Sequence, residues 1–419
     1  MGSGIPVAIA MAGASLVYVM ATGITPDYVV IHRMVGGLDS FPLLAVPFFI
    51  LAGNLMNSAG ITNRIYNFAL ALVGWMRGGL GHVNVLGSVI FAGMSGTAIA
   101  DAAGLGTIEI KAMKDHGYST EFAVGVTAAS ATLGPIIPPS LPFVIYALFA
   151  NVSVGALFLA GILPGVVMAL LMMLTVAFFA HKNKWGADIP FQWPRVLKAL
   201  GELLIVFLWP TLIWIAVDLG TAPTLTVVLA LVVLFAADWK FKFQAVLPIM
   251  TPVLLIGGMT TGIFTATEGA IAACVWSLFL GVVWYRTMNW RNLVKVSMDT
   301  IETTAAVLFI VAAASIFGWM LTATRTTEMI ATWVLSVTST PAGFLLLANL
   351  LMLFVGCFLE PTAAITILVP ILLPIVRQLG IDPVHFGLVM VLNLMIGLLH
   401  PPMGLVLFVL ARVAKLSVE

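Results

Sequence analysis

The chain has 419 residues, of which 61% are hydrophobic and only 8% are charged, and its formal net charge is +1. A soluble domain carries about 25% charged residues, so this composition excludes soluble enzymes and disordered proteins. The near-zero net charge also argues against nucleic acid as a partner. Because the long hydrophobic runs are apolar throughout rather than alternating, they predict an all-α polytopic protein in a lipid bilayer and not a β-barrel.

Apolar runs of about 20 residues predict membrane-spanning helices. In chain order these runs are residues 5–23, 42–57, 154–180, 199–219, 223–238, 299–322 and 386–414. A further apolar stretch, 245–285, is interrupted by Gly257-Gly258 and by Gly262. The first run has no basic segment before it, so we expect a spanning helix there and not a cleaved signal peptide.

Four apolar stretches contain glycine or proline where a simple span would be continuous. The breaks are Gly93-Met94-Ser95-Gly96-Thr97, Gly134 to Ser140, Gly356 to Thr362, and Gly397 to Gly404. Inside lipid, such breaks leave backbone groups unpaired unless protein, ions or water satisfy them. We therefore expect re-entrant hairpins at 79–115 and 342–376, and broken helices at 120–150 and 386–414.

The breaks repeat at a constant spacing of 263 positions. The pairs related in this way are Gly93 and Gly356, Lys114 and Arg377, Gly117 and Gly380, Gly134 and Gly397, and Pro138-Pro139 and Pro401-Pro402. One spacing that holds without a gap predicts two copies of one unit, each a hairpin followed by a broken helix. Residues 199–238 have no counterpart at this spacing, and we assign them to a scaffold.

The charge distribution indicates that the two copies are inverted. If both ends of the first hairpin face the cytoplasm, all 18 Lys and Arg residues except Arg33, Arg325 and Arg377 lie on the cytoplasmic side. This agrees with the positive-inside rule, and the second hairpin must then open to the other face. Two copies of opposite orientation are typical of a secondary transporter whose site lies between the repeats.

The expected domains follow from this pattern. They are scaffold helices with an amphipathic arm at 1–78, a first transport repeat at 79–153, scaffold and connecting helices at 154–340, and a second transport repeat at 341–419. The arm is residues 61–77, which alternate apolar and polar positions and predict a helix along the membrane surface. Residues 326–340 predict a second short lateral helix.

The hairpin breaks carry hydroxyl and carbonyl oxygens, which are the hard ligands that Na⁺ needs. The predicted ligands are Ser95, Gly96 and Gly134 for a first ion, and Gly356, Thr362 and Gly397 for a second. The alternative is that these small residues only let helices pack closely. Asp101 follows the first break and Glu360 lies beside the second, so each either balances the charge of Na⁺ or caps a helix.

The two Pro-Pro breaks predict half-helices that begin near Pro139 and Pro402. A helix N-terminus offers free N–H groups and partial positive charge, which favours a carboxylate. The predicted substrate-binding residues are Thr97, Pro138, Pro139, Ser140, Pro401, Pro402 and Gly404. The alternative is a pair of proline-kinked bundle helices without a ligand.

Motifs of known enzymes are missing or incomplete. The sequence has no G-x-x-x-x-G-K-[ST], so this chain does not hydrolyse a nucleotide itself. Gly93-Met94-Ser95-Gly96 matches the short motif around the nucleophile of rhomboid-type proteases, but no A-H-x-x-G histidine helix supplies the base that a serine needs. We therefore predict that the chain is not an enzyme. A channel or a non-transport scaffold subunit remains the second class of function.

The breaks occur together with other segments in a characteristic order. These segments include Gly4-Ile5-Pro6-Val7-Ala8, Pro47-Phe48-Phe49-Ile50-Leu51-Ala52-Gly53, Arg77-Gly78-Gly79-Leu80, Gly262-Ile263-Phe264-Thr265-Ala266-Thr267-Glu268 and Leu379-Gly380-Ile381-Asp382-Pro383. Together they resemble the large membrane subunit of tripartite ATP-independent periplasmic (TRAP) transporters over nearly the whole chain. One departure is Ala266, where the family usually has proline.

The resemblance implies a Na⁺-coupled importer of small organic acids such as sialic acid or C4-dicarboxylates. It implies two partners: a periplasmic substrate-binding protein that delivers the acid, and a small membrane subunit that braces the large one. It further implies a multi-pass protein of the bacterial inner membrane with an elevator mechanism, in which the hairpins and broken helices move as one body past the scaffold.

Overall fold

The computed structural model describes residues 5–23, 25–218, 232–233, 246–260, 263–400 and 404–414. Over these ranges the chain is helical, and an isolated bridge between Arg77 and Ala187 is the only β-type pairing. Five of the described helices are long and apolar enough to cross a membrane, or six if a pair bent by 117° counts as one span. The predicted all-α polytopic class is therefore confirmed. The span predicted at 223–238 lies outside the described residues except for 232–233.

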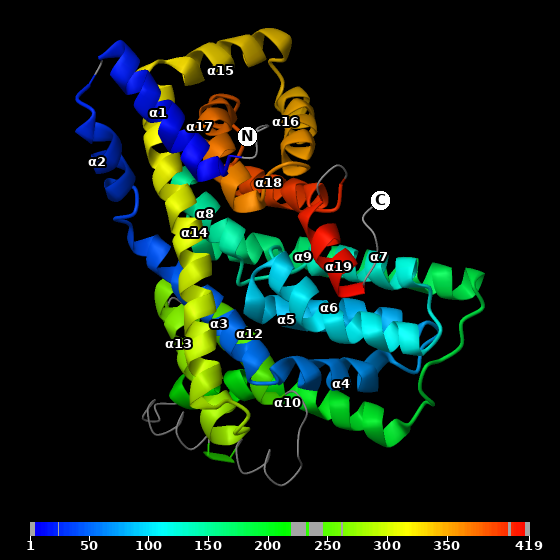
Figure 1. The fold of residues 1–419 in the computed structure, drawn as a ribbon. Coiled ribbons are helices and arrows are strands. Elements are labelled where there is room, and N and C mark those ends of the chain that lie inside the picture. The colour runs from blue at the N-terminus through cyan, green and yellow to red at the C-terminus, as the bar shows by residue number, and fades with distance from the viewer. Residues whose placement is uncertain are drawn as a thin grey trace.

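The N-terminal helices pack on one long helix. They are α1 (Val7–Thr22), α2 (Tyr28–Gly36), a short 3₁₀ turn (Phe41–Leu44) and α3 (Ala45–Ser58). All three α-helices contact α14 (Trp290–Ala323), which runs along this side of the molecule (Figure 1). The helix predicted at 299–322 in fact begins nine residues earlier, at Trp290, and α2 was not predicted.

Each of the two repeats consists of one hairpin and one broken helix. The first repeat holds α5 (Gly79–Ser95), α6 (Ala98–Asp115), α7 (Thr120–Ala131) and α8 (Leu141–Ala150). The second holds α16 (Pro341–Gly356), α17 (Pro361–Gln378), α18 (Pro383–Gly397) and α19 (Leu405–Ala414). Each predicted break separates two helices, because glycine and proline stop the helix where the sequence placed them.

The helix starts show the repeat in atomic detail. Thr97 accepts a hydrogen bond from the backbone N–H of Ala100 at 3.2 Å, and Glu360, 263 positions later, accepts one from the N–H of Ala363 at 3.3 Å. Ser119 and Asp382 cap α7 and α18 in the same way. Gly117 and Gly380 both turn the chain with positive φ, at 83° and 68°. Positions 263 residues apart therefore cap helices or turn the chain in the same way.

The two repeats are interlocked. α8 of the first repeat packs on α17 of the second, and α19 of the second packs on α6 of the first. Within each repeat, the first hairpin arm packs on the first half of the broken helix, so that α5 contacts α7 and α16 contacts α18. Figure 1 shows α8 at the centre of the molecule, between the two hairpins. Because a half-helix of each repeat packs on the hairpin of the other, the two repeats form one packed unit.

Two short helices, α4 (Ile61–Val73) and α15 (Thr326–Val337), precede the hairpins. α4 corresponds to the predicted amphipathic arm, and it buries one face, with Ile61, Ile65 and Phe68, against α5 and α10 (Trp193–Asp218). α15 meets α16 at the 117° bend. Both arms therefore link a scaffold helix to a hairpin.

The middle of the chain contains α9 (Val154–Lys182), α10, α12 (Val246–Thr260) and α13 (Ala266–Leu278), which continues into a π-helical turn (Phe279–Trp284). α10 begins six residues before the predicted residue 199. The break expected at Gly257-Gly258 is wrong, because both glycines lie inside α12. The second predicted break, at Gly262, lies outside the described residues. α12 ends at Thr260, and a capping box of Thr265 and Glu268 begins α13.

Candidate functional site

The two hairpin tips meet around one pocket with an empty volume of about 330 Å³. Thr97 from the first tip lines this tip pocket, together with Glu360 and Thr362 from the second tip. Pro135 reaches it from the first broken helix, and Met395 reaches it from the end of α18. The tip pocket thus draws its walls from both repeats, in the position where an inverted-repeat transporter holds its cargo.

Three helices begin at the tip pocket. The first residues of α6, α8 and α17 are Ala98, Leu141 and Pro361, and all three line it. Each helix N-terminus leaves backbone N–H groups without intrahelical partners and carries a partial positive charge. Many of these N–H groups are already engaged, because Leu141 donates to the Gly96 carbonyl and a capping side chain accepts from the first turn of each helix. The partial positive charge of the three ends is therefore what favours an anion, since no Lys or Arg side chain is among the residues that line the pocket.

At the first tip, the backbone of the hairpin touches the backbone of the broken helix. Gly96 turns the chain with a φ of +64°, and its carbonyl accepts a hydrogen bond from the N–H of Leu141 at 3.3 Å. A Cβ atom on Gly96 would lie 2.8 Å from the carbonyl oxygen of Pro139, and one on Gly134 would lie 3.0 Å from that of Thr97. Glycine is therefore required at both positions.

Two buried oxygen-bearing side chains near the first tip lack protein partners among the described residues. The hydroxyl of Ser95 and both carboxylate oxygens of Asp101 are buried without a hydrogen bond there. A buried polar group without a partner costs roughly 1–3 kcal/mol, so a ligand that satisfies it is favoured. The carbonyl oxygens of Pro139 and Thr97 also lie close to Gly96 and Gly134, so the first tip is rich in oxygen atoms of the type predicted to bind Na⁺.

The second tip has a different arrangement. A Cβ atom on Gly397 would lie 2.7 Å from the Cα atom of Gly356, so the backbones of α16 and α18 are in direct contact. Glu360 caps α17 with one carboxylate oxygen, and its other oxygen accepts a hydrogen bond from the Thr362 hydroxyl at 2.8 Å. The structure thus brings Gly356 and Gly397 together and gives Glu360 the capping role, while the same side chain lines the tip pocket.

Part of the predicted substrate-binding set lies at the tip pocket. Thr97 lines it. The described residues of the set that do not line it are Pro138, Pro139, Ser140 and Gly404. Pro401 and Pro402 fall in residues 401–403, outside the described part of the chain. The tip pocket also includes Glu360 and Thr362, which the sequence had assigned to charge balance and to an ion.

Ser140 has a structural task. Its hydroxyl donates to the carbonyl of Pro135 and accepts from the backbone N–H of Phe143, so it caps α8 and is fully buried. The half-helix predicted to begin near Pro139 begins two residues later, because the Ser140 cap makes Leu141 the first helical residue.

Sequence reasoning missed a buried polar cluster in the first repeat. The side-chain amide of Asn84 on α5 donates to Glu109 on α6 at 2.6 Å and to Thr127 on α7 at 2.7 Å. Ser130 donates to the amide oxygen of Asn84 at 2.7 Å, and Ser88 donates to Ser130 at 3.0 Å. This cluster joins both arms of the hairpin to the broken helix, deep inside the repeat.

The second repeat has a smaller polar contact, in which Asn393, the equivalent of Ser130, donates to the side chain of Asn349 on α16 at 2.7 Å. At the spacing of 263 positions, Asn84 corresponds to Leu347 and Glu109 corresponds to Leu372. Glu109 alone carried a sequence signal, as an ionisable residue in an apolar run. The partners carried none, because their contacts depend on the packing of three helices.

Two features of known enzyme centres are a metal-binding group and a serine activated by a base. No group of three His, Cys, Asp or Glu side chains among the described residues is arranged to hold a metal ion. The Ser95 hydroxyl has no hydrogen-bond partner in the described part of the chain, so no base activates it as a nucleophile.

Known proteins are similar in sequence to nearly the whole of this chain. Residues 1–419 match the family described as "Tripartite ATP-independent periplasmic transporter, DctM component". The sialic acid TRAP transporter large permease protein SiaM of Vibrio cholerae is 41% identical over 99% of this chain and 87% of its own. The sialic acid TRAP transporter permease protein SiaT of Haemophilus influenzae is 38% identical, over 99% of this chain and 61% of its own.

Relatives with other names are nearly as similar. The C4-dicarboxylate TRAP transporter large permease protein DctM of Pseudomonas aeruginosa is 36% identical over 90% of this chain and 78% of its own. Among solved structures, that of the Alcanivorax borkumensis YdaH transporter matches with a TM-score of 0.66 and 14% identity, over 98% of this chain and 91% of the other. At that identity the likeness concerns the fold alone.

Proposed function

This chain belongs to the DctM family of tripartite ATP-independent periplasmic transporters, and from that premise we propose that it is the transport subunit of a Na⁺-coupled importer of small organic acids. The family consists of inner-membrane transporters and not of enzymes, and it implies a small membrane subunit and a periplasmic binding protein as partners. Sialic acid is the first substrate to test, because the 41% identical relative carries that name, and C4-dicarboxylates are the second.

The observation that carries the proposal is the tip pocket between the repeats. The N-termini of α6, α8 and α17 converge on it, and the hydroxyl-bearing residues Thr97 and Thr362 line it. A carboxylate placed there would lie at the partial positive charge of three helix N-termini in a largely apolar surrounding. Backbone dipoles identify a carboxylate but not the remainder of the molecule, which fits relatives whose names mention different acids.

The charge of Glu360 gives a physical reason for Na⁺ coupling. This carboxylate lines the tip pocket, so an organic anion bound about 5 Å away would be repelled by roughly 3 kcal/mol at an effective dielectric constant of 20. That energy corresponds to a loss of affinity of about 200-fold. A Na⁺ ion bound at either tip would offset the repulsion, so we expect Na⁺ to bind before the substrate.

We further propose an elevator movement. Because α8 packs on α17 and α19 packs on α6, neither hairpin is free to move alone. The arms α4 and α15 connect this interlocked body to the scaffold helices α3 and α14. A rigid movement of the body relative to the scaffold would carry the tip pocket across the membrane without breaking the contacts between the repeats.

Proteoliposomes test the proposal. The chain would be reconstituted with its small membrane subunit, and the periplasmic binding protein would be added loaded with radiolabelled sialic acid or succinate. An inward Na⁺ gradient should drive uptake above the equilibrium level, and replacing Na⁺ by choline should abolish it. Uptake that only equilibrates the acid would indicate a channel, and full uptake by the isolated chain would contradict the tripartite assignment.

A further inference from the structure

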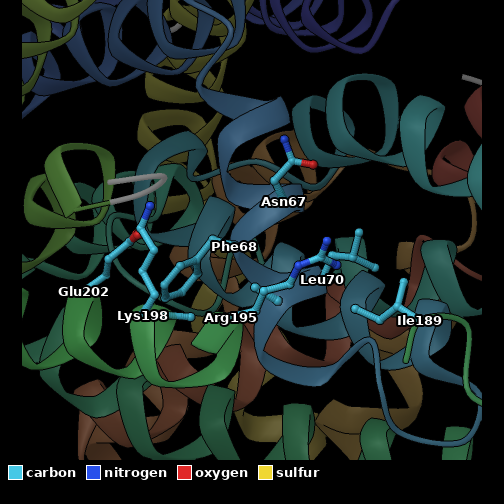
Figure 2. A pocket seen from close by; sticks show the side chains of 9 residues that line it. Asn67, Phe68, Leu70, Ile189, Arg195, Lys198 and Glu202 are labelled. Atoms are coloured by element: carbon cyan, nitrogen blue, oxygen red, sulfur yellow. The ribbon is translucent and has the colours of Figure 1, made fainter. Parts of the chain in front are cut away.

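A second pocket, separate from the tip pocket, lies between α4 and the start of α10 (Figure 2). Its empty volume is about 780 Å³. Asn67 and Phe68 reach it from α4, and Arg195, Lys198 and Glu202 reach it from α10. We call it the arm pocket. None of its lining residues also lines the tip pocket, so it plays no direct part in binding the transported acid.

The arm pocket combines an apolar floor with a basic rim, and the buried carboxyl group of Glu202 also lines it, so two positive side chains face one negative one. Phe68 and Ala199 are almost completely buried and form part of the floor, and the side chains of Arg195 and Lys198 are exposed at the rim. Arg195 lies in the first turn of α10, where a positive charge is disfavoured by the helix dipole. A bound anion would relieve this unfavourable interaction and contact the neighbouring helix N-terminus.

Aromatic side chains near the arm pocket indicate that it lies at the membrane interface. Trp75, Phe191 and Trp193 form a ring cluster beside it, with centroid distances of 4.8 Å and 5.0 Å, and all three side chains are exposed. Exposed aromatic side chains are typical of the boundary between lipid headgroups and acyl chains. Because nearly all of the basic residues lie on the cytoplasmic side of the predicted topology, this interface faces the cytoplasm.

The outer face of α10 continues from the arm pocket as an apolar strip. The residues of this strip are Leu197, Leu200, Leu204, Phe207 and Leu208, and each is at least 42% exposed. From Leu197 to Leu208 a helix advances by about 16 Å, at about 1.5 Å per residue. This length matches one leaflet of the hydrocarbon core, which is about 15 Å, or half of about 30 Å.

We propose that the arm pocket binds an anionic phospholipid of the cytoplasmic leaflet, with its phosphate at Arg195 and Lys198 and its acyl chains along the apolar strip of α10. The basic rim selects for negative charge, and the floor and the strip select for acyl chains. A soluble phosphate would use only the first of these features, so the complete arrangement fits a lipid. Such a lipid would fasten the arm α4 to the scaffold during transport.

The test is lipid binding by the purified full chain. Phosphatidylglycerol and phosphatidylcholine with identical acyl chains are added in detergent, and bound lipid is counted by native mass spectrometry. Phosphatidylglycerol should remain bound at one per chain and should raise the midpoint of thermal unfolding. Arg195→Gln with Lys198→Gln should weaken its binding about fivefold for each charge removed. Arg291→Gln with Lys295→Gln, which removes two exposed charges from the start of α14, should leave binding unchanged.

A second variant separates lipid binding from charge. Ala71→Trp fills the arm pocket from α4 without changing any charge, and it should also lose the lipid. Equal retention of phosphatidylglycerol by the wild type and the Arg195→Gln Lys198→Gln variant would overturn the proposal. So would displacement of the lipid by millimolar inorganic phosphate, equal retention of phosphatidylcholine, or loss of the lipid when the small membrane subunit binds, since that subunit would then be the occupant.

Discussion

The contact between Gly356 and Gly397 allows a stringent test of the second hairpin tip. A Cβ atom on Gly397 would lie 2.7 Å from the Cα and carbonyl carbon atoms of Gly356. Carbon atoms in favourable contact are about 3.5–4.0 Å apart, so Gly397→Ala must separate α16 from α18 by roughly 1 Å. The neighbour is backbone and cannot rotate away. Overpacking of this kind costs about 1–3 kcal/mol.

The same displacement should weaken Na⁺ binding at the second tip. Binding sites tolerate errors of about 0.5 Å in the positions of their ligands, so a movement of 1 Å exceeds that tolerance. If the affinity for Na⁺ falls tenfold, the stabilisation by Na⁺ at ten times the wild-type Kd falls from about 1.4 to about 0.4 kcal/mol. The Gly397→Ala variant should therefore unfold at a lower temperature and gain less from Na⁺.

Thermal unfolding in sodium chloride and in choline chloride measures both effects without a substrate. Gly125→Ala is the matched control, because Gly125 lies inside α7 and nothing comes within 4 Å of an added Cβ atom. Alanine there should be neutral or stabilising by up to about 1 kcal/mol. If Gly397→Ala keeps the wild-type midpoint and the wild-type shift with Na⁺, the close contact and the ion site inferred from it are both refuted.

Three further predictions concern the tips and the first repeat. Ser95→Ala and Thr362→Ala should each raise the Na⁺ concentration needed for half-maximal uptake. Only Thr362→Ala should also lower the free energy of unfolding, by about 1 kcal/mol, because only the Thr362 hydroxyl has a protein partner among the described residues. Unchanged Na⁺ dependence in both variants would remove the ion assignment. Ile99→Trp fills part of the tip pocket from a partly exposed position and should abolish uptake. Assembly with the small subunit, measured by co-purification, should be retained. In the wild type, Asn84→Leu leaves the buried Glu109 carboxyl group without its partner, so it should destabilise the protein by at least about 1 kcal/mol more than it does in a Glu109→Leu background. Additive changes in the free energy of unfolding would show that the two residues are not coupled.

Local signals explain why the hairpins were predictable from the sequence. Glycine and proline stop a helix through backbone geometry alone, so the bounds 79–115 for the first hairpin agree with α5 and α6. The start of α14 was missed because its first turns contain Arg291, Lys295 and Asp299, which lower the hydropathy although the helix continues through them. α2 was missed because it has only nine residues and includes Arg33.

The site was harder to predict, because its residues are distinguished only by tertiary contacts. Ile99, Met395 and Leu398 line the tip pocket, yet in this sequence they resemble any other apolar residue in a span. The hydroxyl of Ser140 beside a Pro-Pro pair predicts a substrate contact, and the structure shows that the same hydroxyl caps α8. The polar cluster around Asn84 joins three helices, and no spacing along the chain indicates it.

The repeats share a geometry but differ in their electrostatics, and this difference bears on coupling. The carboxylate at the tip pocket, Glu360, comes from the second repeat, where the first repeat has the neutral Thr97. Behind the first tip lies Asp101, whose counterpart in the second repeat is Ala364. Each tip therefore presents one carboxyl group, at positions that the symmetry does not relate. Of these two carboxyl groups only Glu360 lines the tip pocket, so an organic anion bound there would be repelled mainly from the second tip. On the proposed function, we therefore expect Na⁺ at the second tip to promote binding of the acid more strongly than Na⁺ at the first.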